Sequence, residues 1–324
     1  MEELNIAGRF ASFFSPIKDG TEEENIEAFE KAAEEQSKVP GVKGVEMHYP
    51  AQFVIPVEKM KEIFDKYNIK VSAINPRFAK DKRFDKGALS HPKQEIRDAA
   101  IDFVKKNIDA AKILDCKVIN VWINRDGHTY AFERDYSLLW GNFVDSLQKL
   151  ADYAPEINLA LEYKYEESPV KTMVRDAGRT LALIQAIDKK NVGANVDYNH
   201  TIMAQECPGE VYDMFLSRGK LFNIHLNDSW YYDDDIMVGS NTPVSLFEVM
   251  TLLRRYKYDG WIYFDTKVIN GSPTEECIEN VETTNQFWRL AHDLDLDKLE
   301  ELREEENVFK IHKLIRTTLF RDPK

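Results

Sequence analysis

The chain has 324 residues, which is long for one ordinary domain but matches a single α/β barrel of ~250 residues or more. Its formal net charge of −13 argues against nucleic acid as a partner, because binding to a phosphate backbone depends on clustered Lys and Arg. No apolar run approaches the ~20 residues that span a bilayer, and the N-terminal segment MEELNIAGRF lacks the pattern of an export signal. Three widely separated cysteines without CxxC spacing indicate reduced thiols. We therefore expect a cytoplasmic protein that contacts neither nucleic acid nor membrane and acts on a small molecule.

Eight short apolar runs alternate with helical patterns along the chain. Apolar residues recur at helical spacing between the runs, for example over 96–114 and 136–154. This alternation, repeated eight times, predicts an α/β fold, a (β/α)8 TIM barrel with a parallel sheet, over residues 1–295. A charged segment over 296–324 predicts a short C-terminal helical extension that packs on the barrel or a neighbouring subunit, or is simply solvated. The expected strands cover 5–10, 44–49, 70–76, 117–123, 158–164, 192–199, 221–228 and 260–268.

A charged residue closes each of the last four runs. These residues are Glu162, Asp197, His225 and Asp265, and each is out of place in a core. Side chains at the C-terminal ends of barrel strands meet at one rim, so the four are expected to converge. Three carboxylates and an imidazole favour a divalent metal, with Mn, Co or Mg preferred and Zn possible. We therefore expect one or two metal ions per chain.

A second group of ligand-type residues lies close to the first in the sequence. His200 follows Asp197 by three residues, and Asp233 and Asp235 end an acidic run eight to ten residues after His225. One carboxylate could bridge two metals while His200, Asp233 and Asp235 hold the second, an arrangement that binds adjacent oxygens of a polyol. A solvated acidic loop is the alternative, and the position after His225 favours the metal.

Four further residues are candidates for substrate contacts. Lys164 lies two residues after Glu162 on the same strand face, where an ammonium can polarise a carbonyl oxygen or merely neutralise the carboxylates. Trp122 can wall the site against water or belong to the core. Arg77 and Arg125 follow the third and fourth runs and could contact an anionic substituent, although surface salt bridges are the commoner role.

The motifs resemble the xylose isomerase-like barrel superfamily, and particularly its two-metal aldose–ketose isomerases of the xylose and L-rhamnose isomerase type. The resemblance covers residues 44–268 and includes GVEMH, WINRDG, the ExK pattern, NVDYNHTIMA and FDTKV, while HLNDSWYYDDDIMVGS is closer to the rhamnose type. It implies a metal-assisted 1,2-hydride shift between an aldose and a ketose. The implied catalytic residues are Lys164, His48 and Asp265, and the implied sugar contacts are Trp122, Arg125, Arg77 and Asn227.

The chain departs from this resemblance at several points. Ala51 stands where an aspartate partner of His48 is expected, which puts ring opening by that pair in doubt. The seventh run supplies His225 where xylose isomerase has an aspartate. The long C-terminal arm of the larger enzymes is missing, so their tetramer cannot be carried over, although a homo-oligomer is expected.

Other functions fit the sequence less well. A single-metal ketose 3-epimerase, or a related lyase acting on oxidised glycosides, would use carboxylate acid–base chemistry, but Asp265 is shorter than the expected glutamate and His200, Asp233 and Asp235 would lack a role. A DNA-repair endonuclease with three zinc ions would have many more histidines at the rim and a basic surface, whereas this chain has seven histidines in all and a charge of −13. A non-catalytic sugar-binding or metal-storage barrel does not explain Lys164 beside two metal sets.

Overall fold

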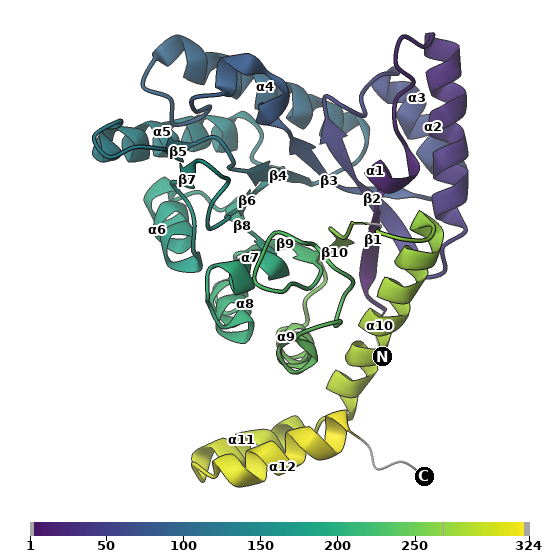
Figure 1. The fold of residues 1–324 in the computed structure, drawn as a ribbon, viewed down its shortest axis with the longest axis vertical. Coiled ribbons are helices and arrows are strands. Elements are labelled where there is room, and N and C mark those ends of the chain that lie inside the picture. Colours follow the sequence, from purple (N-terminus) through teal and green to yellow (C-terminus); the bar gives the residue numbers. More distant parts are fainter. Residues whose placement is uncertain (1–2, 268, 321–324) are drawn as a thin grey trace.

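The computed structural model describes residues 3–267 and 269–320, and it forms a closed parallel barrel surrounded by helices (Figure 1). The strands follow one another around the barrel in the order β1-β10-β9-β8-β6-β4-β3-β2. This confirms the predicted (β/α)8 fold, and each of the eight predicted runs contains a barrel strand. The barrel strands are β1 (Asn5–Arg9), β2 (Val42–Tyr49), β3 (Lys70–Pro76), β4 (Val118–Trp122), β6 (Asn158–Glu162), β8 (Val192–Asp197), β9 (Leu221–Leu226) and β10 (Trp261–Phe264). Position 268, the end of the eighth predicted run, lies outside the described residues.

Helices cover the outside of the barrel, and several begin with strong local signals. A capping box joins Thr21 and Glu24 at the start of α2, and another joins Ser272 and Glu275 at the start of α10. The predicted helices over 96–114 and 136–154 correspond to α4 and α5. The helices are α1 (Phe10–Phe13), α2 (Glu22–Ser37), α3 (Val57–Lys66), α4 (Gln94–Ile113), α5 (Tyr136–Tyr153), α6 (Ala177–Ile187), α7 (Tyr198–Met203), α8 (Pro208–Leu216), α9 (Pro243–Arg255), α10 (Pro273–Asp293), α11 (Leu296–Glu304) and α12 (Val308–Leu319), with short 3-10 turns over Phe78–Lys80 and Lys82–Phe84.

The last two helices extend away from the barrel at the C-terminal end of the chain (Figure 1). Leu299 and Leu302 of α11 are buried, whereas no residue of α12 is fully buried. The helical extension is therefore present, and its last four positions, 321–324, lie outside the described residues. Its division from the barrel at residue 295 as a separate unit stays a prediction. Within 3–267 and 269–320, no helix is long and apolar enough to cross a membrane.

A small two-stranded antiparallel sheet, absent from the sequence prediction, connects two rim loops. It pairs β5 (Gly127–His128), after β4, with β7 (Lys171–Thr172), after β6. The Met173 amide donates to the Asp126 carbonyl at 2.8 Å, which extends the pairing. A Cβ at Gly127 would lie 2.1 Å from the Lys171 carbonyl oxygen, so only glycine permits this approach. The two-stranded sheet fixes the loops beside the strand ends that carry the candidate site.

Candidate metal centre

The four charged strand-end residues meet at the C-terminal rim of adjacent strands β6, β8, β9 and β10. His225 Nδ1 lies 3.6 Å from Glu162 Oε2, 3.7 Å from Asp197 Oδ2 and 3.6 Å from Asp265 Oδ2. Ligand atoms that share one cation each lie ~2.1 Å from it, so separations of this size fit a single ion. Asp197, His225 and Asp265 could therefore hold a divalent cation between them, with Glu162 against the same histidine nitrogen, and the four-residue ligand set stays a prediction.

Glu46, inside the barrel on β2, orients His225. Its Oε2 lies 3.0 Å from His225 Nε2, and both side chains are buried. With Nε2 hydrogen-bonded to a carboxylate, Nδ1 is the nitrogen left for a cation, and it is buried without a hydrogen-bond partner among the described residues. Burial alone would lower the pKa of His225, but the charges of Glu46 and Glu162 raise it well above its usual value. A cation at Nδ1 would thus displace a proton.

His200 forms a second set with the same two carboxylates. Glu162 turns its other oxygen, Oε1, toward His200 Nδ1 at 3.6 Å. Asp197 Oδ2 lies 4.0 Å from His200 Nε2, and Asp233 Oδ1 lies 3.8 Å from the same nitrogen. Glu162 and Asp197 therefore stand between two histidines, His200 and His225, and could bridge two cations. Burial opposes protonation of His200, but Asp197, Asp233 and Glu162 raise its pKa to about 9.

The local sequence explains how His200 reaches the site. Asp197 is both the last residue of β8 and the N-cap of α7, and its Oδ1 accepts a hydrogen bond from the His200 amide at 3.2 Å. A side chain three residues into the first helical turn then lies on the same side as the cap. The carboxylate-x-x-His spacing is thus a direct consequence of a strand that runs into a helix.

Asp235 lies beside these sets but is engaged by other groups. Its Oδ2 lies 2.7 Å from Lys267 Nζ, and its Oδ1 accepts hydrogen bonds from the side-chain amides of Asn199 at 3.1 Å and Asn227 at 3.4 Å. Burial and the neighbouring charge of Asp265 raise the pKa of Asp235 to about 6. It is close enough to feel the other carboxylates, and its role as a metal ligand stays a prediction.

Asn227 holds the ligands in place. Its side-chain amide donates to Asp197 Oδ1 at 3.2 Å and to the Asp265 carbonyl at 3.2 Å, and its Oδ1 accepts from the Asn199 amide at 2.9 Å. These contacts connect β8, β9 and the end of β10 at the rim. A direct contact of Asn227 with substrate, as the resemblance implies, stays a prediction.

Lys164 lies between the second set and the aromatic wall. Its Nζ donates to Glu167 Oε2 and to Asp233 Oδ2, each at 2.7 Å, and lies 5.4 Å from the centre of the Trp122 ring. Burial would lower the pKa of Lys164, but Asp233 and Glu167 raise it above its usual value. The residue is thus a charged ammonium directly beside a candidate ligand.

A layer of polar side chains beneath the ligands was missed by the sequence analysis. Asn120 donates to Glu162 Oε2 at 2.6 Å and to Glu46 Oε1 at 3.3 Å. Asn195 donates to Glu162 Oε2 at 3.2 Å, and Asn223 donates to Glu46 Oε2 at 3.4 Å. All are buried inside the barrel, so the layer fixes both a ligand and the partner of a ligand.

A sequence signal for this layer exists. Strand side chains alternate, so a residue two positions before a rim residue points into the same barrel interior. A polar residue in that position is unexpected in a core unless it supports a site. The pairs are Glu46 before His48, Asn120 before Trp122, Asn195 before Asp197 and Asn223 before His225.

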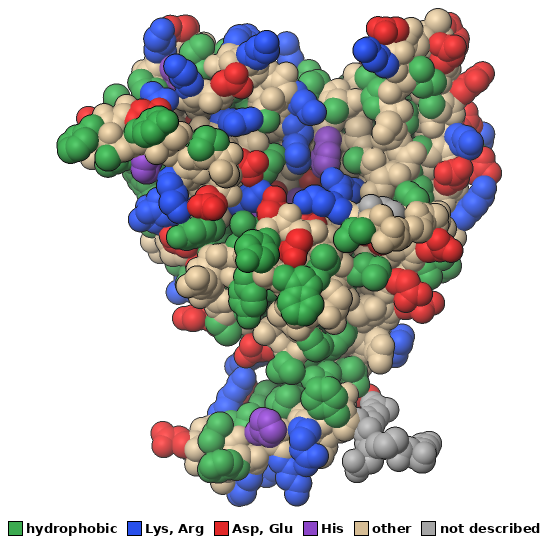
Figure 2. Space-filling view, viewed as in Figure 1, with side chains coloured by type: hydrophobic (Ala, Val, Ile, Leu, Met, Phe, Trp, Pro, Cys, Tyr) green, Lys and Arg blue, Asp and Glu red, His purple; other side chains and the backbone are tan. Residues whose placement is uncertain are grey.

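The remaining predicted residues come from the ends of β2, β3 and β4, next to the ligand strands in the barrel. Burial, together with the charge of Arg77, lowers the pKa of His48 to about 4, so its imidazole is neutral at pH 7. The guanidinium carbon of Arg77 lies 4.2 Å from the centre of the Trp122 ring. Arg125 has a buried Nε without a partner among the described residues. Figure 2 shows acidic, basic and His side chains gathered around the hollow in the middle of this face.

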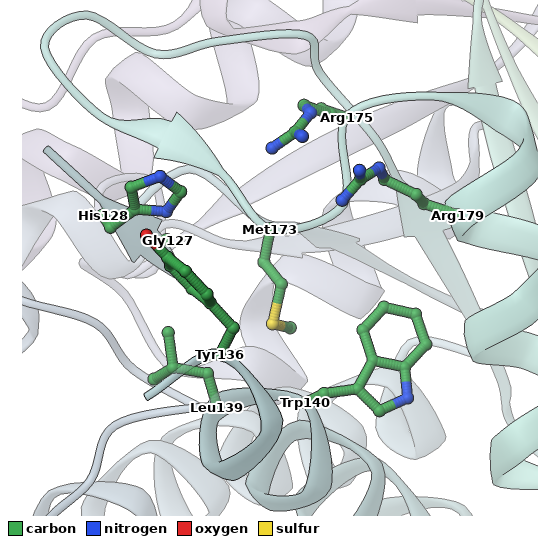
Figure 3. Close-up of a pocket in the computed structure, with 8 residues that line it drawn as sticks. All are labelled: Gly127, His128, Tyr136, Leu139, Trp140, Met173, Arg175 and Arg179. Atoms are coloured by element: carbon green, nitrogen blue, oxygen red, sulfur yellow. The ribbon is translucent and has the colours of Figure 1, made fainter. Parts of the chain in front are cut away.

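A separate pocket lies beside the two-stranded sheet of β5 and β7, outside the metal centre. Its cavity has a volume of about 390 Å³, and in Figure 3 the guanidinium groups of Arg175 and Arg179 extend toward it from one side, with the Trp140 ring below them. None of the predicted site residues lines it. The lining residues are Gly127, His128, Tyr136, Leu139, Trp140, Met173, Arg175 and Arg179.

The closed parallel barrel, with carboxylates and imidazoles at its C-terminal strand ends, defines a (β/α)8 barrel protein with a candidate metal centre. The family model of the xylose isomerase-like TIM barrel matches residues 19–287. The chain therefore belongs to this family, as its motifs predicted.

Curated relatives in the family are sugar isomerases by name. The chain is 26% identical over 226 residues to a xylose isomerase from Thermus thermophilus, which covers 68% of this chain and 58% of that protein. It is 27% identical over 258 residues to a probable sugar isomerase from Rhizobium meliloti, covering 76% of this chain and 57% of that one. The chain thus spans little more than half the length of these relatives.

Solved structures with the same fold are named as epimerases. An L-ribulose 3-epimerase superposes with a TM-score of 0.72 at 13% identity, covering 90% of this chain and 96% of that one. A D-tagatose 3-epimerase-like protein gives a TM-score of 0.70 at 17% identity, covering 90% and 99%. At these identities the likeness shows the fold alone.

Proposed function

We propose that the protein is a metal-dependent sugar isomerase that interconverts an aldose and a ketose by a 1,2-hydride shift. The observation that carries this proposal is the position of Glu162, which directs one oxygen toward His200 and the other toward His225, so that one carboxylate can serve two cations. The xylose isomerase and probable sugar isomerase among its relatives support the same activity.

The donor set fits divalent cations. Two histidine nitrogens, His200 Nδ1 and His225 Nδ1, are buried without hydrogen-bond partners among the described residues. Three carboxylate oxygens lie within 3.7 Å of His225 Nδ1, and Glu162 Oε1 lies 3.6 Å from His200 Nδ1. When bound, divalent ions supply Lewis acidity to two adjacent oxygens of the open-chain sugar. The first would be held by Glu162, Asp197, His225 and Asp265, and the second by Glu162, Asp197, His200 and Asp233, with Asp235 as a further proposed ligand.

The chain's other residues would stabilise and shield the reacting carbons. Lys164 keeps its proton and can donate a hydrogen bond to the carbonyl oxygen, where negative charge develops as hydride moves. Trp122, beside it, presents an apolar ring that keeps water from the two carbons. A hydride shift removes no proton from carbon, so the carboxylates are free to act as ligands. His48, neutral and without the expected aspartate, would bind a sugar hydroxyl.

A ketose 3-epimerase is the second candidate. The set around His225 is complete for one cation by itself, and the epimerase structures share the fold. In that reaction Glu162 and Asp265 would exchange a proton with carbon. In that reaction the second set, His200 with Asp233, would have no role. This favours the isomerase.

Metal stoichiometry and solvent exchange separate the two reactions. Metal-stripped protein is loaded with Mn²⁺ or Co²⁺ and incubated in heavy water with matched panels of aldoses and ketoses. The isomerase is expected to bind two ions per chain and to form product with little deuterium, because the hydride never leaves the sugar. One ion per chain, together with rapid deuterium incorporation at carbon 3 of a ketose, would establish the epimerase instead.

A further inference from the structure

Arg77 differs from the other cations around the mouth of the barrel. Its side chain is half-buried at the end of β3, and among the described residues it has neither a side-chain hydrogen bond nor an ion pair. Its side chain stacks on the Trp122 ring, whose centre lies 4.2 Å from the guanidinium carbon. The guanidinium nitrogens of Arg77 have no hydrogen-bond partner among the described residues, and they are not buried. They therefore remain reachable from solvent. A guanidinium held by stacking, with its donors free, is prepared for a ligand.

Three other cations near the strand ends are already paired with carboxylates. Lys164 is paired with Asp233 at 2.7 Å, and Lys267 is paired with Asp235 at 2.7 Å. Arg9 lies 3.7 Å from Asp265 and donates to the Thr266 carbonyl at 2.9 Å. Arg125, after β4, also lacks an ion pair among the described residues, so the surplus positive charge of this part of the rim belongs to Arg77 and Arg125, of which Arg77 is the one stacked on the Trp122 ring.

The strand order places this charge away from the candidate ligands. Ligands come from β6, β8, β9 and the end of β10, whereas Arg77 follows β3 and is separated from Lys164 by β4 and its Trp122. A sugar whose carbonyl end lies beside Lys164 would extend along the indole ring toward the guanidinium. The group that meets Arg77 thus belongs to the end of the sugar that does not react.

We propose that the substrate is an anionic aldose, with a carboxylate or phosphate on the carbon farthest from the carbonyl, and that Arg77 binds this group. A guanidinium donates paired hydrogen bonds to either anion in a planar fork, which a neutral hydroxyl cannot match. The inference rests on the proposed isomerase and adds its substrate class. An unpaired cation inside the mouth supplies the local positive charge that an anionic group would meet.

The test compares matched substrates and matched arginine variants. Mn²⁺-loaded protein is assayed with aldohexoses, the corresponding uronates and the corresponding 6-phosphates, for kcat/KM and, by calorimetry, for binding. Arg77→Gln removes the charge, and Arg77→Lys keeps the charge but loses the fork. Arg83→Gln is the control, because Arg83 also stacks on a ring, that of Phe84 at 5.4 Å, but is already paired with Asp81 at 2.6 Å.

We expect one anionic series to be favoured over its neutral counterpart, and which series is favoured identifies the anion. Arg77→Gln should lose about 10- to 100-fold in affinity and kcat/KM for that series while neutral sugars change little, the size expected for hydrogen bonds to a charged group. Arg77→Lys should retain part of the preference and Arg83→Gln all of it, with unfolding temperatures confirming that each variant is folded.

Two outcomes overturn different claims. Turnover of neutral aldoses as efficient as that of anionic ones, with no loss in Arg77→Gln, removes the substrate class and leaves the isomerase. Absence of turnover in every series contradicts the isomerase, and calorimetry then decides the role of Arg77 separately. Binding of anionic sugars that is equal in wild type and Arg77→Gln shows that the anion contacts the metal instead, and this too overturns the inference.

Discussion

Replacing Glu46 by glutamine is expected to weaken metal binding while the barrel stays folded. Glu46 is fully buried, and its carboxylate lies 3.0 Å from His225 Nε2 while accepting from Asn120 at 3.3 Å and Asn223 at 3.4 Å. Glutamine has the same shape, but its amide group faces one of these donors instead of accepting from it. The change therefore removes the charge that fixes His225 and leaves one contact unsatisfied.

The size of the effect follows from the position of Glu46 behind a ligand. Outer partners of metal-binding histidines typically contribute 10- to 100-fold in metal affinity, about 1.4 to 2.8 kcal/mol. Exchanging a charge-assisted hydrogen bond of about 1.5–3 kcal/mol for a neutral one of about 0.5–1.5 kcal/mol costs about 1 to 1.5 kcal/mol, which is near the lower end of that range. The loss of metal affinity expected for Glu46→Gln is therefore well below the loss expected for removing a ligand itself.

Calorimetric titration of Mn²⁺ into metal-stripped protein measures the effect. Glu206→Gln is the matched control, because Glu206 accepts from the Tyr163 hydroxyl at 2.7 Å and the Ala177 amide at 2.9 Å and, among the described residues, has no hydrogen bond or ion pair with a candidate ligand. It should leave the Mn²⁺ affinity unchanged even where it lowers the unfolding temperature. If Glu46→Gln binds Mn²⁺ within twofold of wild type, or if Glu206→Gln loses as much, Glu46 does not position His225 for a cation.

Three further predictions concern the shared carboxylate, the lysine and the second histidine. Glu162→Gln should abolish turnover and lower Mn²⁺ stoichiometry at both positions, whereas Asp233→Asn should abolish turnover but leave one ion per chain; two tight ions in Asp233→Asn would contradict its assignment. Lys164→Met should lower kcat by about 100-fold with Mn²⁺ stoichiometry unchanged, and near-normal kcat would exclude its role. In metal-free protein the raised pKa of His200, about 9, stabilises the fold below pH ~6.5, and this contribution of about 3 kcal/mol is lost as pH rises to about 9. Chemical denaturation across that range should show the decline in wild type but not in His200→Asn, while Mn²⁺ affinity, which requires loss of that proton, should rise with pH.

The convergence of the four strand-end residues could be predicted because one geometric rule places them. A parallel barrel brings the C-terminal ends of its strands to one rim, so charged residues that end Val- and Ile-rich runs converge without knowledge of any loop. Glu162, Asp197, His225 and Asp265 follow this rule. His200 follows a second rule, the helical turn after an N-cap.

Loop residues could not be placed in the same way. The acidic run predicted ligands at Asp233 and Asp235, but the pairing of Asp235 with Lys267 depends on the path of two loops that no periodicity determines. The strands β5 and β7 of the two-stranded sheet are two residues long each, which is too short for a strand pattern in the sequence. Arg77 was expected to form a surface salt bridge, and its lack of a carboxylate partner among the described residues becomes visible only in three dimensions.

Strand order also accounts for how an acidic protein would hold the proposed anionic sugar. The carboxylates occupy one half of the rim, where two divalent ions would neutralise most of their charge, and the cations paired with Asp233, Asp235 and Asp265 offset more of it. Potential near the mouth therefore depends on metal loading, and Arg77 contributes charge that is not offset nearby. Because charge effects beyond ~8 Å are screened at physiological salt, the surface charge of the rest of the chain has little influence there. Removal of the metal should consequently weaken the binding of an anionic sugar much more than the binding of a neutral polyol. Both ligands lose the cations that hold their oxygens, but the anionic sugar also loses the charge that balances the carboxylates.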